Sequence, residues 1–491
     1  MANISQEEFK LRRKDSEVFS VISDFRGDDI SAIRIFQGFQ GEGKFIFESG
    51  GKENYFGRYS YLSENPYKEI MGNEYEEIEK IKKEVTINFN SQCNSFTFKG
   101  GAIGYIGYDS VAFYEKKLSF KNKDELNVPT VRFNFYKRYL CYDNFTHRVY
   151  VVDNIFYDDN RTYEEIMEEQ KEYFYKLAKN KDFLVGAKGE TYEEFKKCEK
   201  NEKEYKYKKC EDVEKNAKCK VEFKLSIPKD EFIKKIERAK EYIVQGDIFQ
   251  VVLSERMYCK TDKTPFEIYR RLREENPSPY MFLIDYKEYQ VIGSSPESLV
   301  ALKGNKVVTN PIAGTRKRGN GELEDNILAK ELIEDKKELA EHVMLVDLGR
   351  NDIGRVSKCG TVEVGDFMKV EKFSHVMHIT SKVIGEIRED KDAFHALAAC
   401  LPVGTVSGAP KIRAMEIIEE LESVRRGIYS GAVGYFSYGG NMDMSIAIRT
   451  LVLKDGVAYL QAGAGIVYDS IPEKEFDEIE NKLLVLKEVL R

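Results

Sequence analysis

Residues 335–352 read DKKELAEHVMLVDLGRND, a stretch that predicts an amphipathic helix. Leu339 and Val346 recur at helical spacing on its apolar side. Glu338 and Glu341 lie three residues apart and therefore share one face of that helix. Two carboxylates this close repel each other unless a positive charge lies between them. The helix predicts either a cation site or, as is commoner for a single such pair, a solvated charged face.

The sequence PEKEFDEIENK, residues 472–482, carries a second acidic pair on a predicted C-terminal helix. Glu475 and Glu478 are again three residues apart, and Lys482 follows Glu478 by one helical turn. If the fold brings the two helices face to face, four carboxylate groups surround one point. Oxygen ligands on rigid helices favour a hard divalent cation such as Mg²⁺, which keeps water or substrate oxygens in its remaining positions. The alternative is two charged helix faces in water, which a chain with 33% charged residues also explains.

The composition of the chain narrows its class and its partners. With 491 residues, of which 42% are hydrophobic, the chain can build two or three domain-sized cores. Its formal net charge of −7 offers no basic surface, so we expect neither nucleic acid nor a membrane as a partner. No stretch reaches membrane-spanning length, and the eight cysteines lack a metal-ligand spacing. We therefore expect a cytoplasmic protein with reduced thiols.

Changes of character along the chain predict two domains joined by a linker. Residues 1–157 are β-rich and contain two strand-like runs around the turn residues Asp143 and Asn144, a hairpin signal. Residues 158–225 begin with a helical stripe and continue as a charge-dense run, which indicates a solvated linker. Residues 226–491 alternate helices and strands and form the second domain.

Several segments of the second domain have patterns that bear on a binding site. In the strand-like run 248–256, Gln250 alternates with apolar neighbours and points to the opposite face. Residues 311–318, PIAGTRKR, predict a glycine-containing basic loop. Residues 445–453 predict one continuous strand of a hairpin.

The same domain concentrates groups that bind anions. Residues 463–465, Gly-Ala-Gly, are able to present successive backbone N–H groups as a small nest for a carboxylate. Arg449, on a strand leading towards that turn, supplies a guanidinium that forms paired hydrogen bonds with carboxylates. Gly314 and Thr315 offer backbone and hydroxyl donors. Each of these groups alone is unremarkable, and Arg449 has the simpler alternative of pairing with a surface acid.

Two further residues have an ordinary alternative to a catalytic role. His378, in SHVMHITS, lies in an apolar strand, where a histidine is more often a core or surface residue than a catalyst. Glu297 follows Pro296 in a turn, where a helix cap or a solvated loop charge is the simpler interpretation.

Taken together, the motifs resemble one family. They are GDIFQVVLS (246–254), NPSPYMF (276–282), SSPESL (294–299), PIAGTR (311–316), EHVMLVDLGRND (341–352), VMH (376–378), LPVGTVSGAPK (401–411), YSGAVGY (429–435), AIR (447–449), QAGAGIV (461–467) and EFDEIENK (475–482). The chain resembles component I of the anthranilate synthases, within the chorismate-utilising enzymes. The first domain matches more loosely, through FIFES (45–49), GRYS (57–60) and GGAIGY (100–105).

This resemblance implies an α/β (α+β) fold in which large antiparallel β-sheets are layered with helices. The implied reaction is the first committed step of tryptophan biosynthesis, in which chorismate and ammonia give anthranilate and pyruvate, with Mg²⁺ as cofactor. Ammonia would come from glutamine through a separate amidotransferase subunit, component II, in a hetero-oligomer. The chain has no G-x-C-x-G motif of its own, which agrees with a separate source of ammonia.

The resemblance also assigns roles to the residues named above. Glu341 and Glu478 would bind Mg²⁺, with Glu338 and Glu475 in support. The residues that would hold chorismate are Gly314, Thr315, Tyr429, Arg449, Gly463, Ala464, Gly465 and Lys482. The residues that would take part in catalysis are Glu297, as acid on the C4 hydroxyl, Gln250, and His378 with Thr405, in the elimination of pyruvate.

Two positions favour this member of the family over its relatives. Isochorismate and salicylate synthases typically have a lysine at the position of Gln250, and a neutral glutamine cannot activate water in that way. Aminodeoxychorismate synthases typically have a lysine at the position of Ala313, which here has no amine. The alternatives are an aminodeoxychorismate synthase component I and a sensor of tryptophan or chorismate that has lost catalysis.

The resemblance further implies feedback inhibition by tryptophan. Ser49, Pro279, Tyr280 and Met281 match the family's tryptophan-binding site between the two domains. The usual Leu-Leu before Glu-Ser is Ile-Phe here, at residues 46–47, which is a departure in the wall of that site. Tryptophan bound there would favour an inactive state, which is allostery in the strict sense.

Overall fold

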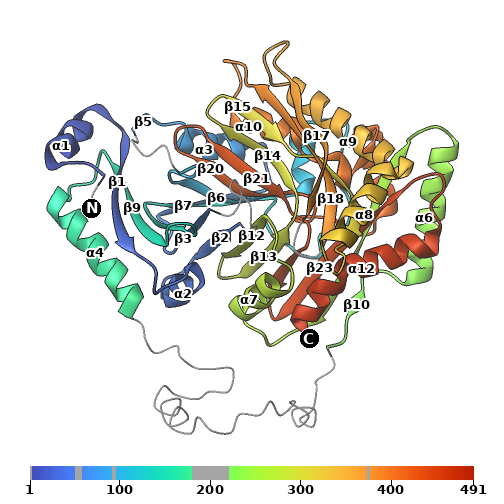
Figure 1. Ribbon diagram of the computed structural model, residues 1–491, viewed down its shortest axis with the longest axis horizontal. Helices are drawn as coiled ribbons and strands as arrows, with labels where there is room; N and C mark the ends of the chain where they lie inside the picture. Colours follow the sequence, from blue (N-terminus) through green and yellow to red (C-terminus); the bar gives the residue numbers. More distant parts are fainter. Residues whose placement is uncertain (1–2, 50–57, 91–95, 180–220, 373–375) are drawn as a thin grey trace, which may run out of the picture.

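Strands from both ends of the chain join into two large sheets in the computed structural model, which describes residues 3–49, 58–90, 96–179, 221–372 and 376–491 (Figure 1). Among these residues the larger sheet has thirteen strands, in the order β10 (Lys224–Leu225), β11 (Gln250–Lys260), β23 (Val457–Ile466), β22 (Thr450–Lys454), β13 (Tyr289–Ser295), β12 (Tyr280–Asp285), β2 (Phe45–Glu48), β3 (Tyr59–Ser63), β8 (Arg138–Asp143), β9 (Arg148–Phe156), β1 (Val18–Arg26) and β5 (Phe89–Asn90), with β19 (Gly408–Ala409) paired to β11. The smaller sheet, counted in the same way, has ten strands, in the order β16 (Ile312–Lys317), β18 (Val376–Glu386), β15 (Lys306–Thr309), β14 (Ser298–Lys303), β21 (Met442–Ile446), β20 (Ala432–Ser437), β6 (Gly101–Ile106), β7 (Val131–Tyr136) and β4 (Lys68–Gly72), with β17 (Glu363–Lys372) paired to β18.

Helices cover the outer faces of the two sheets. They are α1 (Gln6–Asp15), α2 (Ala32–Gly38), α3 (Tyr75–Val85), α4 (Tyr163–Lys179), α6 (Lys229–Val244), α7 (Pro265–Glu275), α8 (Glu322–Glu334), α9 (Lys336–Gly354), α10 (Ala393–Cys400), α11 (Lys411–Leu421) and α12 (Pro472–Leu490), with short 3₁₀ helices η1 (Tyr108–Phe113) and η3 (Gly404–Val406). Helices α2, α4, α6, α7, α11 and α12 share an apolar core with the larger sheet, and α3, α9 and α10 share one with the smaller sheet.

A third apolar core lies between the two sheets. It joins Phe45 and Val291 of the larger sheet to Ile103 and Val433 of the smaller one. Its neighbour Ile46 points to the opposite, helix-covered face, as successive residues of a strand do. The order of layers is therefore helix, sheet, sheet, helix, which confirms the predicted fold of large antiparallel sheets layered with helices.

Both sheets run across the boundary between the predicted domains. In the larger sheet β2 pairs with β12, with Phe47 opposite Phe282. In the smaller sheet β6 pairs with β20, with Gly104 opposite Gly434. These two strands come from GGAIGYIGYD (100–109) and SGAVGYFSYG (430–439), which are similar in sequence and lie side by side. Neither of the two sheets, and none of the three apolar cores described above, is confined to one of the segments 1–157 and 226–491.

Two local predictions hold in detail. The helix predicted over 335–352 is α9, and Asp335 caps it by accepting hydrogen bonds from the backbone N–H groups of Lys337 and Glu338. The hairpin predicted around Asp143 and Asn144 is β8 and β9. Helix α4 provides the helical stripe of the predicted linker, and the charge-dense run after it, residues 196–220, lies outside the described residues.

Two other predictions are wrong. Residues 311–318 do not form a loop, because β16 takes most of them into the smaller sheet beside β18, with an irregularity between Ala313 and Arg316. Residues 445–453 do not form one strand. The chain leaves the smaller sheet after β21, passes through Arg449 in the left-handed conformation (φ +49°), and enters the larger sheet as β22. Both errors bear on the site described below.

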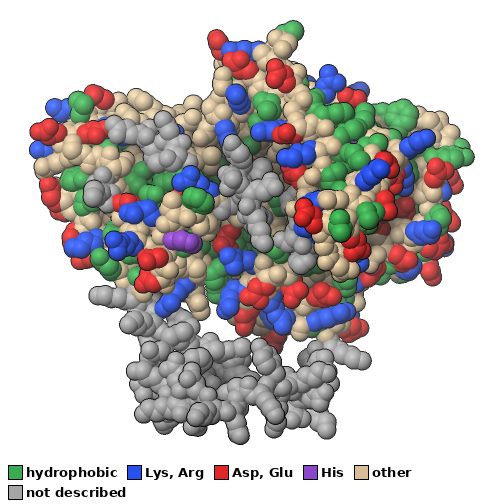
Figure 2. Space-filling view, viewed as in Figure 1, with side chains coloured by type: hydrophobic (Ala, Val, Ile, Leu, Met, Phe, Trp, Pro, Cys, Tyr) green, Lys and Arg blue, Asp and Glu red, His purple; other side chains and the backbone are tan. Residues whose placement is uncertain are grey.

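The distribution of charged side chains on the surface agrees with the high content of charged residues in the sequence. On the face shown in Figure 2, acidic and basic side chains are interspersed over most elements. Among the described residues, no helix is both long enough and apolar enough to cross a membrane.

Candidate active site

One cavity of about 540 Å³ gathers nearly all of the predicted site residues. It is bordered by α9, α12 and η3 and by strands β11, β16, β18 and β23. The predicted residues on its wall are Gln250, Glu297, Gly314, Thr315, Glu338, Glu341, His378, Thr405, Tyr429, Arg449, Gly463, Gly465, Glu475, Glu478 and Lys482. Ala464, by contrast, is fully buried in the core on the helix-covered side of the larger sheet.

The acidic faces of α9 and α12 both border this cavity. Burial raises the pKa of Glu341, and repulsion from Glu338 and Glu478 adds to this rise. Lys482 pairs with Glu478 at 2.8 Å, and Arg316 lies 3.6 Å from Glu338. Within the described part of the chain, no group of three or more Asp, Glu, His or Cys side chains is placed to hold a metal ion. All four carboxylates lie on the wall of one cavity, and their convergence on one cation stays a prediction.

Glu341 and Glu478 nevertheless have the chemistry of a magnesium site. Both residues present carboxylate oxygens from a helix. Mg²⁺ is commonly held by one or two carboxylates together with water and substrate oxygens. The raised pKa of Glu341 means that Lys337 and Lys482 compensate its negative charge only in part, and a bound cation would compensate it further. The donor set thus fits a cation that shares its remaining positions with a ligand.

Glu297 and Arg449 lie where the chain crosses between the two sheets. Glu297 separates β13 of the larger sheet from β14 of the smaller one, and Arg449 separates β21 from β22. The N–H of Ile446 donates to the carbonyl of Glu297 (3.0 Å), and the N–H of Ser294 donates to the carbonyl of Arg449 (3.1 Å). The two crossings are held side by side in this way, and their side chains both border the cavity.

Glu297 has the properties of a general acid. Its side chain is buried, and burial raises its pKa to about 7, although a hydrogen bond from Thr405 and the positive charge of Lys482 act in the opposite direction. The hydroxyl of Thr405 donates to Oε1 of Glu297 at 3.1 Å. A carboxyl group with such a pKa carries its proton in an appreciable fraction of molecules near neutral pH and can give it to a bound ligand.

Among the residues that the structure describes, Arg449 is a cation without a carboxylate partner. Its Nη1 donates to the carbonyl of Lys482 at 2.9 Å, and in the described ranges no ion pair joins its guanidinium to an acid. Burial lowers the pKa of this guanidinium, which means that its charge is poorly compensated. An anionic ligand in the cavity would supply the missing charge.

The position of His378 is determined by its contact with β16. Nδ1 lies 2.8 Å from the carbonyl oxygen of Gly314, and since a carbonyl only accepts, Nδ1 carries the proton and Nε2 the lone pair. The hydroxyl of Thr315 lies 3.2 Å from the same nitrogen. Burial lowers the pKa of His378, and the charge of Arg449 lowers it further. Gly314 has φ +64°, a conformation that favours glycine and turns its carbonyl towards His378.

The glycines at 463 and 465 do not form a nest. They lie in the extended strand β23, paired with β11. A Cβ atom on Gly465 would lie 2.6 Å from Nε2 of Gln250, and one on Gly463 would lie 3.1 Å from the hydroxyl of Tyr429. The glycines therefore leave room in the cavity, and Ala464 between them points to the other face of the sheet. The carbonyl of Gly463 accepts from Nζ of Lys482 at 2.8 Å.

Two polar side chains on the wall of the cavity, those of Lys337 and Gln461, were not predicted from the sequence. Lys337, on α9, helps to lower the pKa of Glu341. Gln461 lies on β23 and shares a face with Gly463 and Gly465 because strand residues alternate. The two-residue spacing of Gln461 from Gly463 could have identified Gln461 from the sequence. For Lys337 the only sequence signal was its position next to Glu338.

A second cavity, of about 310 Å³, lies between the sheets where β2 joins β12. Its wall includes the predicted residues Ser49, Pro279, Tyr280 and Met281. Aromatic side chains complete the wall, among them Tyr59, Tyr61, Phe282 and Tyr435. Among the described residues, the hydroxyl of Ser49 is buried without a hydrogen-bond partner. Such a group is expected to meet a ligand or water.

Comparison with known proteins identifies one family. A family model described as chorismate binding enzyme matches residues 42–488. The chain is 42% identical to anthranilate synthase component 1 of Acetivibrio thermocellus, over 98% of this chain and 97% of that protein, and 43% identical to the one of Lactococcus lactis, over 94% and 97%. The crystal structure of anthranilate synthase component I from Streptococcus pneumoniae superimposes with a TM-score of 0.74 at 38% identity, over 95% of this chain and 98% of that one. The menaquinone-specific isochorismate synthase of Escherichia coli shares the fold, with a TM-score of 0.69 at 16% identity, over 99% of each chain.

Proposed function

The chain belongs to the chorismate-binding enzymes, and we propose that it is the component of an anthranilate synthase that converts chorismate and ammonia to anthranilate and pyruvate. One observation carries the proposal: Arg449, Glu297 and Glu341 border the same cavity. An anion anchor, a protonated acid and a cation site are the three groups needed by an anionic ring that must lose a hydroxyl group.

Each group has a defined task in this reaction. Arg449 binds the enolpyruvyl carboxylate of chorismate by paired hydrogen bonds. Glu341 and Glu478 would hold Mg²⁺, with Glu338 and Glu475 in support, and the bound ion would neutralise the ring carboxylate. Gly314, Thr315, Tyr429 and the glycines of β23 shape the cavity around the ring.

Two side chains move protons. Glu297 gives its proton to the C4 hydroxyl, which leaves as water while ammonia adds at C2. His378 then takes the proton from C2 through Nε2, the electron pair of that C–H bond completes the aromatic ring, and the C3–O bond breaks. The departing enolate takes up a proton from the solvent to give pyruvate. Thr405 holds Glu297 in place for the first of these steps.

The uncharged side chains at two positions favour anthranilate over the related products. Gln250 and Ala313 border the cavity where isochorismate and aminodeoxychorismate synthases typically have lysine. Neither side chain can act as a base for water or as an amine nucleophile. Ammonia is therefore the nucleophile that we propose, delivered from glutamine by an amidotransferase subunit, in line with the name component 1 of the relatives.

The proposal predicts turnover without the partner. The purified chain, given chorismate, Mg²⁺ and ammonium at high pH, should form anthranilate and pyruvate in equal amounts, because free ammonia replaces the partner's product. Glutamine alone should not replace ammonium, and removal of divalent cations should stop the reaction. Mass spectrometry should detect the aminated, pyruvyl-bearing intermediate in His378→Met. The proposal would be refuted if the protein formed the 4-amino product of aminodeoxychorismate synthases instead of anthranilate. It would also be refuted if a folded protein formed no product.

We also propose that tryptophan inhibits this enzyme from the second cavity. The aromatic side chains on the wall suit an indole, and the Ser49 hydroxyl, which has no hydrogen-bond partner among the described residues, is available to the charged amino acid groups. The cavity borders the β2–β12 join, so a ligand there acts on strands of both halves of the chain. A ligand that binds this join better in an inactive arrangement shifts the equilibrium towards that arrangement.

For Ser49→Ala we expect an increase of about tenfold in the tryptophan concentration that halves activity, because a hydrogen bond to a charged group contributes about 1.5 kcal/mol or more. The uninhibited kcat should not change. Ser445→Ala is the matched control, since Ser445 borders the same cavity but its hydroxyl already donates to the carbonyl of Val433 (3.0 Å). Equal tryptophan sensitivity in wild type and Ser49→Ala would show that Ser49 does not bind tryptophan.

A further inference from the structure

A buried ion pair lies directly behind the wall of the active-site cavity. Glu422 and Arg426 follow α11, and they are 8% and 2% exposed. Nε and Nη2 of Arg426 donate to the two carboxylate oxygens of Glu422, at 2.9 and 2.6 Å. Neither side chain borders the cavity. Taking two charges out of water costs free energy unless every donor and acceptor is satisfied, so the other contacts of the pair are informative.

Arg426 uses its remaining N–H groups on the backbone of residues that line the cavity. Nη2 donates to the carbonyl of Val252 on β11 (2.7 Å), and Nη1 donates to the carbonyl of Val406 in η3 (2.6 Å). Nη1 also lies 3.5 Å from the hydroxyl of Ser430, just before β20. One guanidinium therefore joins three segments of the cavity wall, with all five of its N–H donors used.

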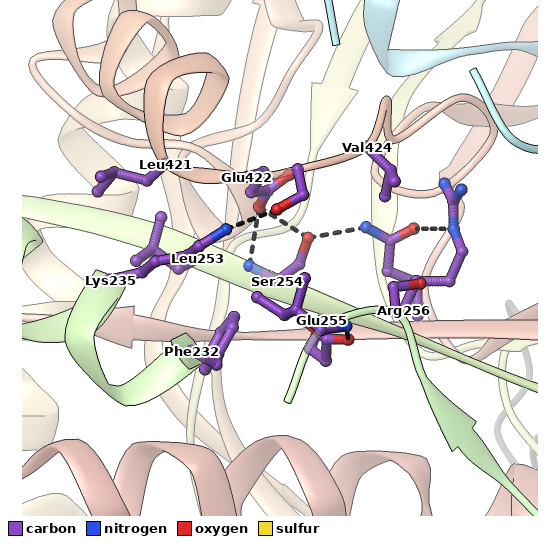
Figure 3. A pocket seen from close by; sticks show the side chains of 13 residues that line it. Phe232, Lys235, Leu253, Ser254, Glu255, Arg256, Leu421, Glu422 and Val424 are labelled. Atoms are coloured by element: carbon purple, nitrogen blue, oxygen red, sulfur yellow. Dashed lines mark hydrogen bonds between the residues drawn. The ribbon is translucent and has the colours of Figure 1, made fainter. Parts of the chain in front are cut away.

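Glu422 reaches the cavity wall by a second route, through Ser254. Figure 3 shows Glu422 and Ser254 on the wall of a separate, smaller pocket. One carboxylate oxygen of Glu422 accepts from both the N–H and the hydroxyl of Ser254 on β11, each at 2.8 Å. The hydroxyl of Ser254 accepts from Nε2 of Gln461 at 2.8 Å, and Gln461 borders the active-site cavity. Nε of Arg256 donates to the other end of Gln461 at 3.2 Å. The pair is thus the centre of a connected set of polar contacts behind the cavity.

The hydrogen bond from Arg426 to Val406 connects the ion pair indirectly to Glu297, the proposed acid. Val406 follows Thr405, whose hydroxyl donates to Glu297. A hydrogen bond to the carbonyl of Val406 restricts the backbone of η3, and so restricts where the Thr405 hydroxyl lies. We propose that Arg426, held by Glu422, is a positioning residue that keeps Thr405 on Glu297 so that the acid can protonate the leaving hydroxyl. This inference rests on the proposed function.

Few other groups act on Glu297 in the ranges that the structure describes. Lys482, on α12, is the charged group that influences it through space. Asp352 on α9 and Cys400 on α10 border a smaller cavity that Glu297 also touches, and Asp352 is compensated by Lys411 at 2.9 Å. Among the described residues, the Thr405 hydroxyl is the group that hydrogen-bonds to the carboxylate of Glu297. A change in its position should therefore be measurable at Glu297.

The test compares Arg426→Lys with wild type in the ammonium-dependent reaction. A lysine keeps the charge but cannot reach Glu422, Val252 and Val406 together. We expect kcat to fall about tenfold or more, since a small misplacement of a catalytic group is costly, with less than a threefold change in KM for chorismate. The alkaline limb of the pH profile of kcat/KM should move to higher pH, because the Thr405 bond favours the ionised form of Glu297.

Two further variants separate positioning from mere packing. Thr405→Val should move the limb in the same direction, and Arg426→Lys combined with Thr405→Val should move it no further. Arg132→Lys is the matched control, because Arg132 is also buried (4% exposed) and paired with an acid, Glu69 (2.7 Å), but lies away from this cavity. The alkaline limb of the pH profile of Arg132→Lys should not move. If Arg426→Lys does not fold, Ser254→Ala removes one contact to Glu422 and should give a smaller shift of the same sign.

An activity-independent measurement completes the test. Infrared titration of the carboxyl band of Glu297 in the ligand-free protein, with Glu297→Gln as the subtraction, should report a higher pKa in Arg426→Lys than in wild type. This readout stands even if wild type makes no anthranilate, which would end the proposed function alone. An unmoved titration, or shifts that add in the double variant, would overturn the positioning role.

Discussion

Arg449→Met is expected to lower kcat/KM for chorismate by about 10²- to 10³-fold, mainly through KM. The loss of one partner from a buried, hydrogen-bonded charge pair costs about 2–5 kcal/mol, and each 1.36 kcal/mol corresponds to a factor of ten. The guanidinium of Arg449 has no carboxylate partner in the described residues, and its contact is a backbone carbonyl of α12. A substrate carboxylate would therefore be its main source of compensation. Because that carboxylate is bound before and during the reaction, the effect falls on binding.

The measurement is steady-state kinetics with ammonium at fixed pH. Arg449→Lys should lose less than Arg449→Met, since it keeps the charge but not the planar fork. Arg413→Met is the control, because Arg413 lies on α11 and has its own acids, Asp247 at 2.7 Å and Glu416 at 2.8 Å. A KM for chorismate within threefold of wild type in Arg449→Met would show that another group anchors the substrate.

The helices that carry the proposed metal ligands could be predicted from the sequence because their signals are local. Glu338 and Glu341, like Glu475 and Glu478, are three residues apart, and that spacing alone places each pair on one helix face. The apolar stripe of α9 and its cap at Asp335 are equally local. Whether the four carboxylates converge depends on how the helices pack, and here they border one cavity without forming one cluster.

The crossings between the sheets could not be predicted in the same way. The break at Arg449 follows from the pairing of β21 with β14 and of β22 with β13, which are partners far away in the chain. The basic segment at 311–318 has the composition of a loop, yet β18 supplies the hydrogen bonds that make it a strand. Ala464 shares its neighbourhood with two cavity glycines, and only the alternation of β23 turns it away. Long-range pairing decided the first two cases, and strand alternation decided the third.

Glu297→Gln is expected to change activity and stability in opposite directions. The amide cannot give a proton to the leaving hydroxyl, and general acid catalysis typically contributes about 10²- to 10⁴-fold, so kcat and kcat/KM should fall together by that factor. The hydrogen bond from Thr405 can persist, since the amide oxygen accepts as the carboxylate does. Wild-type kcat/KM, expressed per free ammonia, should decline above pH 7 as Glu297 ionises, whereas the residual activity of Glu297→Gln should not.

The expected gain in stability follows from the pKa of this buried acid. Folding raises the pKa of Glu297 from 4.5 to about 7, so between these values the folded protein binds more protons than the unfolded chain, and stability falls as pH rises. Above pH 7 the whole penalty of about 3 kcal/mol is present, and below pH 4.5 it is absent. Glu297→Gln has no such penalty, so its free energy of unfolding at pH 8 should exceed that of wild type by about 3 kcal/mol. The difference should vanish near pH 4.

The control is a second buried acid with the same physics and no contact with the cavity. Glu255 is 2% exposed, burial raises its pKa to about 7, and its carboxylate accepts from the N–H of Ile227 at 3.0 Å. Glu255→Gln should therefore gain stability at pH 8 as Glu297→Gln does, while its kcat stays at the wild-type value. Denaturant unfolding at pH 4 and pH 8 measures both differences. If Glu297→Gln gains stability but keeps wild-type activity, Glu297 is not the general acid. If Glu297→Gln loses activity without a gain in stability at pH 8, burial does not raise the pKa of Glu297.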